Sequence, residues 1–171
     1  MTQNPFESMI HSNANEALFE PFLRTGKAFP DALEKVWKIG GQSKVVQKTV
    51  QILGFNAKLS RSEHVEQYIK GATEVPFNVF LELMNSMRKF DGLRFLHDVE
   101  CPTLIISGEE DLIVPPHNQI TDHKLMPNSK FVTVPLGSHC SPLDRPGFVN
   151  HEIREFLKDE IRPLMNGKSD A

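Results

Sequence analysis

The sequence predicts an α/β protein in which a helical region precedes two parallel strands and their helices. Several short segments of residues 1–100 carry apolar side chains at helical spacing. The short apolar run Thr103–Ser107 is typical of a strand, and a second strand is expected at Lys130–Val134 after an intervening helix. We therefore expect two parts, a helical region at 1–100 and a strand-containing part at 101–171.

The helical region is expected to form four or five short helices. Pro30-Asp31 is typical of a helix start, and Gly40-Gly41 is expected to stop that helix. Ser43 is a natural N-cap for the next helix, which Gly54 ends. The expected helices are Asn15–Arg24, Pro30–Ile39, Lys44–Leu53, Glu63–Lys70 and Phe77–Phe90.

The first strand is bounded by Pro102 and Gly108, and its centre is continuously apolar, as in a strand buried on both faces of a parallel sheet. Such a strand is too apolar for a water-exposed edge, so it needs a neighbouring strand. After it we expect a helix at Pro116–Met126, the second strand, a loop over Leu136–Arg145 and a last helix at Pro146–Met165.

Two loops are the candidate site. Gly108 lets the chain turn out of the sheet, and Asp111 lies three residues later. The second strand ends at Pro135, and the loop after it carries His139. Because the carboxyl ends of parallel strands meet at one edge, an acid and a base are expected side by side there.

This part of the chain resembles the C-terminal part of the α/β-hydrolases. The resemblance rests on Gly108-Glu109-Glu110-Asp111 after a strand, then Gly137-Ser138-His139 after a helix and a strand, over roughly Cys101–Leu157. It implies that Asp111 is the acid and His139 the general base of a catalytic triad, in the chain order nucleophile, acid, histidine. Asp111 would orient the imidazole, and His139 would take the proton of the nucleophile.

The nucleophile of such a triad is not recognisable in the sequence. Gly-x-Ser-x-Gly does not occur, and its nearest approximations, around Ser43 and Ser138, lack the second glycine. We therefore expect a helical cap followed by the C-terminal portion of the fold, without the half that carries the nucleophile. Relatives with an aspartate nucleophile share this portion, so serine and aspartate both stay open.

Several other residues of the chain are candidates for the acid, the nucleophile or a metal ligand. Glu109 and Glu110 compete with Asp111 for the role of the acid, although the spacing from the glycine favours Asp111. Ser138 and Cys140 adjoin the histidine, but adjacent loop residues usually point apart, so neither is expected to be its nucleophile. Asp144 is interpreted as an N-terminal cap of the last helix. His117 and His123 are not spaced to share a helix face, so no metal site is expected.

The composition of the chain indicates which partners, compartment and cofactors to expect. The chain has 19 Lys and Arg against 22 Asp and Glu, so we expect no nucleic-acid partner. It has no apolar stretch long enough to span a bilayer and no signal-peptide pattern at residues 1–10. The two cysteines favour a reduced, cytoplasmic setting. The sequence contains neither a phosphate-binding glycine loop nor a Cys-x-x-Cys pair, so we expect no cofactor.

Two functions from different classes follow. The first is an esterase-like hydrolase acting on a small apolar ester or related carbonyl compound, with Asp111 and His139 in the triad. It is expected to be inactive as this chain alone, because the nucleophile would come from a missing N-terminal half. The alternative is a truncated, non-catalytic, hydrolase-like fragment that acts as a binding or self-associating module.

Overall fold

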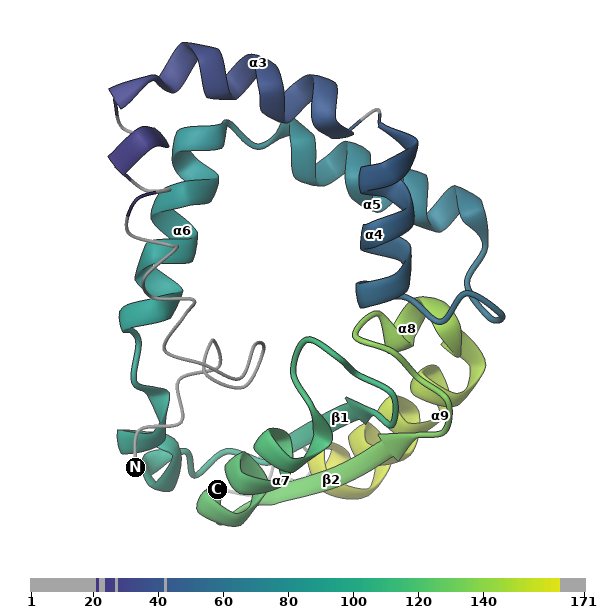
Figure 1. Cartoon of the computed structure of the whole chain (residues 1–171). Helices are drawn as coiled ribbons and strands as arrows, with labels where there is room; N and C mark the ends of the chain where they lie inside the picture. Colours follow the sequence, from purple (N-terminus) through teal and green to yellow (C-terminus); the bar gives the residue numbers. More distant parts are fainter. Residues whose placement is uncertain (1–20, 22–23, 27, 42, 164–171) are drawn as a thin grey trace.

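The computed structural model describes residues 21, 24–26, 28–41 and 43–163 of the 171-residue chain. In Figure 1 a group of helices lies above a pair of strands, and two further helices lie against the strands. The order along the chain, helices first and then the strand pair, is the order that the sequence predicts.

Among the described residues, the helical region has four helices with amphipathic patterns. They are α3 (Pro30–Gly41), α4 (Lys44–Gly54), α5 (Ser62–Glu74) and α6 (Phe77–Lys89). Helix α3 ends at Gly41, within the expected Gly40-Gly41 stop, whereas the expected stop at Gly71 is wrong, because α5 continues through this glycine to Glu74. A glycine inside a helix costs about 1 kcal/mol, which packing of an apolar face readily outweighs. The expected helix Asn15–Arg24 lies largely outside the described residues.

Two short turns connect the helical region to the strand pair. Two 3₁₀ turns, η1 (Gly92–Arg94) and η2 (Leu96–Asp98), precede the first strand. Strand β1 (Thr103–Gly108) pairs in parallel with β2 (Ser129–Val134), as the sequence predicts.

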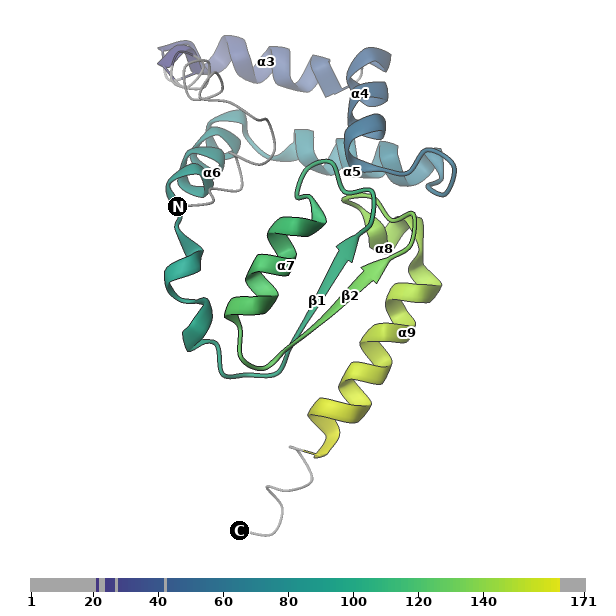
Figure 2. The same ribbon diagram turned by 60° about the horizontal axis from the view of Figure 1, so that its bottom comes forward.

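Helices cover both faces of the strand pair. Helix α7 (Pro116–Leu125) connects the two strands, and α9 (Pro146–Phe156) follows the short α8 (Ser141–Asp144). Helices α7 and α9 lie on opposite faces of the strands in Figures 1 and 2. The last helix continues through the π-turn η3 (Leu157–Ile161), and the end of the expected helix at Met165 lies outside the described residues.

The packing of the described residues is uneven. Phe77 and Leu81 form one small core in the helical region, and Phe55, at the end of α4, forms a second one with Val65 and Ile69 of α5. The strands are mostly half-buried, although burial of β1 on both faces was expected. The sheet of the described residues has two strands, so β1 and β2 each keep one edge without a strand partner there. In the same residues, no helix is both long and apolar enough to cross a membrane.

Candidate active site

The acid lies at the carboxyl end of β1, in a loop that it orders itself. Asp111 is buried, and its Oδ1 accepts hydrogen bonds from the backbone N–H groups of Ile113 and Val114, both at 2.8 Å. Such local bonds from an aspartate to the backbone fix the turn and the carboxylate together. The second oxygen, Oδ2, is left for a partner on another loop.

That partner is His139. Its Nδ1 lies 3.1 Å from Asp111 Oδ2, and its side chain is 36% exposed whereas that of Asp111 is 5% exposed. The parallel strands bring the two loops to the same edge, as the sequence predicts. The imidazole is therefore anchored at Nδ1 and partly open to solvent, which is the arrangement that a general base needs.

A glycine allows the two loops to touch. A Cβ added to Gly108, the last residue of β1, would overlap the backbone oxygens of Ser138 and Gly137 and would lie 2.6 Å from Ser141 Oγ. On the other loop, Leu136 holds a left-handed backbone with φ of 57°. That conformation strains an L-residue, so this turn is held by its surroundings. Glu109 Oε2 accepts the Leu136 N–H at 2.9 Å.

The electrostatics of the pair favour its charged form. Burial acts to raise the pKa of Asp111, but the hydrogen bond from His139 and those from the backbone outweigh it, so this pKa lies below its ordinary value. The hydrogen bond to Asp111 raises the pKa of His139 against the opposing effect of burial, and the charge of Asp111 adds to the rise. The two shifts agree in sign, as expected for an imidazolium beside a carboxylate.

Glu109 and Glu110, the other two candidates for the acid, form hydrogen bonds with other groups. The carboxylate of Glu109 accepts from the Leu136 backbone, and Glu110 Oε2 accepts from Asn56 Nδ2 at 3.2 Å. Both glutamates are exposed, whereas Asp111 is buried and contacts the imidazole. The geometry therefore brings together Asp111 and His139 and leaves the two glutamates as supports of the loops.

The neighbours of the histidine are poor nucleophiles in this geometry. Ser138 is buried, and its Oγ lies 2.8 Å from the Gly54 carbonyl oxygen and 2.5 Å from Asp144 Oδ2. Burial, with the nearby charges of Asp144 and Asp111, raises the pKa of Cys140 to about 11, so its thiol stays protonated at neutral pH. Ser43 lies at the start of α4, in the helical region, and makes no capping side-chain bond.

The interpretation of Asp144 as a helix cap is wrong. Helix α9 begins at Pro146, and the residue in its N-cap position is Arg145. Asp144 is buried and accepts instead from the backbone N–H of Asn56 at 3.1 Å and from that of Ser138 at 2.7 Å. Asn56 and Asp144 were not singled out as site residues, since these contacts join segments far apart in the sequence.

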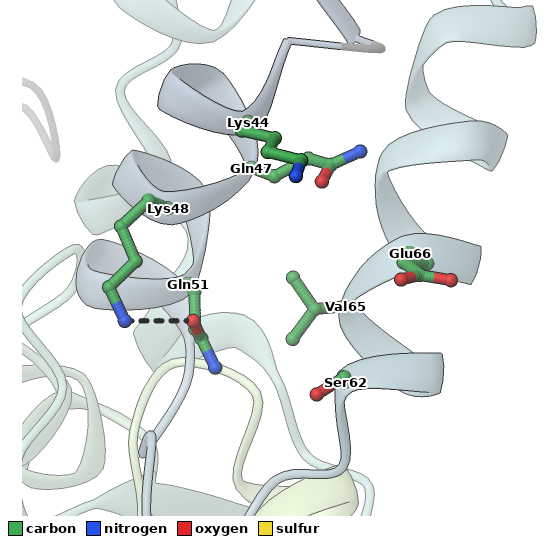
Figure 3. Close-up of a pocket in the computed structure, with 7 residues that line it drawn as sticks. All are labelled: Lys44, Gln47, Lys48, Gln51, Ser62, Val65 and Glu66. Carbon is green, nitrogen blue, oxygen red and sulfur yellow. Dashed lines mark hydrogen bonds between the residues drawn. The ribbon is translucent and has the colours of Figure 1, made fainter.

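Two hollows lie in the helical region, away from the acid and histidine loops. One, of about 220 Å³, lies between α4 and α5 and is lined mostly by polar and charged residues. Figure 3 shows the hydrogen bond between Lys48 and Gln51 on its wall, and the Nζ and Oε1 atoms of this bond are 3.3 Å apart. The other, of about 350 Å³, is almost wholly apolar and is lined from α3, α4 and α5, with Trp37 and Ile69 among its walls. The described residues contain no group of three or more metal-binding side chains.

Solved structures identify the fold. The chain is similar to an esterase from Thermogutta terrifontis, with a TM-score of 0.61 and 22% identity over 79% of this chain and 50% of the esterase. An α/β-hydrolase from a Medee basin deep-sea metagenome library matches with a TM-score of 0.55 and 22% identity, over 81% of this chain and 52% of that one. MenH from S. aureus matches with a TM-score of 0.57 and 20% identity, over 88% and 55%.

The chain thus has the α/β-hydrolase fold, as the resemblance predicted, and spans about half the length of these structures. In sequence, it is 33% identical over 78 residues to RutD from Klebsiella pneumoniae subsp. pneumoniae, which is named as a candidate carbamate hydrolase. That match covers 45% of this chain and 29% of RutD. No protein-family model matches the sequence.

Proposed function

We propose that the chain supplies the acid and the base of a hydrolase that cleaves an ester or a related carbonyl bond. The observation that carries this proposal is the contact of 3.1 Å between His139 Nδ1 and the buried carboxylate of Asp111. An imidazole held in this way can take a proton from a nucleophile and return it to the leaving group. The similarity to an esterase and to a candidate carbamate hydrolase supports the choice of bond.

In this proposal the nucleophile lies outside these 171 residues. The sequence contains no Gly-x-Ser-x-Gly, and the geometry around Ser138 and Cys140 argues against both. The nucleophile, serine or aspartate, would come from the portion of the fold that the match to half-length neighbours leaves uncovered. The helical region would act as a cap over the site, and the substrate that we propose is a small apolar ester.

A hybrid protein tests the proposal. The 171 residues are joined to the half of the T. terrifontis esterase that they do not match, and hydrolysis of a short-chain activated ester is measured. We expect turnover by the hybrid, about 10³-fold less in its His139→Ala and Asp111→Asn variants, and none by the 171 residues alone. A matched control, Asp98→Asn, changes an exposed carboxylate whose partner is the exposed His97 at 3.2 Å, and should leave turnover unchanged.

Two results would contradict the proposal. Turnover by a folded hybrid that survives both substitutions would remove His139 and Asp111 from the reaction. Turnover by the 171 residues alone, abolished in His139→Ala, would mean that the nucleophile lies within them, with Ser138, Cys140 and Ser43 to be tested next.

A second candidate is a non-catalytic module that associates with a second copy. Large apolar side chains are exposed on the described helices, among them Val36, Ile39 and Val45, and β1 has an edge without a strand partner in the described residues. Light scattering of the purified chain tests this candidate. A monomer over a wide range of concentrations would contradict it, whereas a dimer without ester turnover in any hybrid would favour it.

The cytoplasmic setting is part of the proposal as well. Both Cys101 and Cys140 are free thiols, which suits a reducing compartment. Cell fractionation with an antibody against the chain checks this, and recovery in a secreted fraction would contradict it.

A further inference from the structure

The loop that carries His139 is also hydrogen-bonded to a second buried carboxylate, Asp144, which is not part of the Asp111–His139 pair. Asp144 is only 6% exposed. A buried carboxylate is costly unless hydrogen bonds compensate its charge, and here both oxygens are used. Oδ2 accepts the Ser138 N–H at 2.7 Å and lies 2.5 Å from Ser138 Oγ. Oδ1 accepts the Asn56 N–H at 3.1 Å and the hydroxyl of Ser60.

These partners belong to two different parts of the fold. Ser138 directly precedes the histidine, whereas Asn56 and Ser60 lie in the connection between α4 and α5, residues 55–61. Figure 1 shows this connection lying beside α8 at the lower ends of the helices. Asp144 therefore joins the helical region to the loop that carries the proposed base.

Other bonds between the same two segments support this junction. The Cys140 N–H, on the other side of the histidine, donates to the carbonyl of Gly54 at 2.9 Å. Asn56 Nδ2 donates to the carbonyl of Leu136 at 2.8 Å. Both residues that flank His139 are thus hydrogen-bonded to the junction, while its imidazole is held by Asp111 alone in the interactions of the described residues.

We propose that Asp144 is a positioning residue for His139: it locks the histidine loop to the α4–α5 connection, so that the imidazole stays against Asp111 while the helical region is docked. This role rests on the proposed function, because it acts through His139. Without the carboxylate, the buried N–H of Ser138 and the partly buried N–H of Asn56 lose their acceptor. They would turn to water and carry the loop, and the imidazole, away from Asp111.

The readout is the titration of His139, followed by NMR in the 171-residue chain. The pKa of this imidazole is raised through its hydrogen bond to Asp111, and Asp144 is not among the causes of that rise. An Asp111→Asn variant gives the pKa that His139 has without the carboxylate of Asp111 beside it. We expect the His139 pKa of Asp144→Ala to fall most of the way from the wild-type value to that of Asp111→Asn.

A second variant keeps the test valid if Asp144→Ala does not fold. Ser60→Ala removes one donor to Asp144 from the helical side and leaves every charge in place. It should lower the His139 pKa in the same direction by a smaller amount. The matched control is Ser86→Ala, which removes an exposed hydroxyl on α6 and should leave the titration unchanged.

The outcomes separate this inference from the proposed function. A raised His139 pKa in wild type that is unchanged in folded Asp144→Ala, or in Ser60→Ala where the former does not fold, would overturn the positioning role alone. A wild-type His139 pKa equal to that of Asp111→Asn would overturn the positioning role and the proposed function together, because no pair would then exist to be positioned.

Discussion

The coupling between Asp111 and His139 should be measurable as stability in a double-mutant cycle. The cycle compares wild type, Asp111→Asn, His139→Gln and the double variant by urea unfolding. A hydrogen bond to a charged group contributes about 1.5–3 kcal/mol when buried. Because the His139 side chain is 36% exposed, solvent screening reduces the expected coupling to about 1 kcal/mol.

The pH dependence of this coupling has a definite sign. The pKa of His139 is raised on folding, so its contribution is fully present at low pH and is lost as the pH rises through the folded pKa. The pKa of Asp111 is lowered, so its contribution is present above its unfolded pKa and is lost as the pH falls through the folded one. The coupling should therefore be largest between the ordinary values of 3.8 for aspartate and 6.5 for histidine.

The cycle is run at about pH 5.5 and again at about pH 9, above the histidine titration. A neutral imidazole still donates from Nδ1, so we expect the coupling to fall to roughly half rather than to vanish. A coupling of zero at both values, or one that grows with pH, would refute the electrostatic account of the pair.

Three further predictions concern the loops around the pair. Gly108→Ala should cost at least about 2 kcal/mol of unfolding free energy, since the added Cβ would overlap the histidine loop. Gly147→Ala, whose added Cβ would meet nothing within 4 Å, should instead gain about 0.5–1 kcal/mol. Equal effects of the two substitutions in urea unfolding would contradict this prediction. Leu136→Gly should stabilise the chain by about 0.5–1 kcal/mol by relieving a φ of 57°, and a loss of stability in the same assay would argue against strain there. A thiol reagent at about pH 8 should modify the exposed Cys101 well before Cys140, whose pKa is raised to about 11; mass spectrometry that finds Cys140 modified first would disprove this.

The strand-containing part was predictable because its signals are local. An apolar run that ends in Gly108 marks β1, and parallel strands place the loops after them at one edge. The positions of Asp111 and His139 beside each other follow from these two facts and the order of the elements. The choice of Asp111 over Glu109 and Glu110 as the acid follows from the spacing after Gly108 and stays a prediction, and Asp111 is the one of the three that contacts the imidazole.

The role of Asp144 could not be predicted in the same way. A polar residue just before a helix is locally a cap, and that reading misses partners that lie 88 and 84 residues away in Asn56 and Ser60. The end of α5 was missed for a related reason. Gly71 is a local stop signal, but α5 continues to Glu74, and Thr73 in this last turn lies close to Gly41 of α3. Contacts between distant segments decide both cases.

The measurement that tests the central claim most directly is the pH dependence of kcat/KM for ester hydrolysis by the hybrid. A general base must be neutral to take a proton, so activity should rise with pH through a pKa above the ordinary value of histidine. In Asp111→Asn the same limb should move to lower pH while the plateau drops, because the group that raises the pKa of His139 is gone. An acidic limb that Asp111→Asn leaves unmoved would contradict the account, since the titrating group would then not be an imidazole held by that carboxylate.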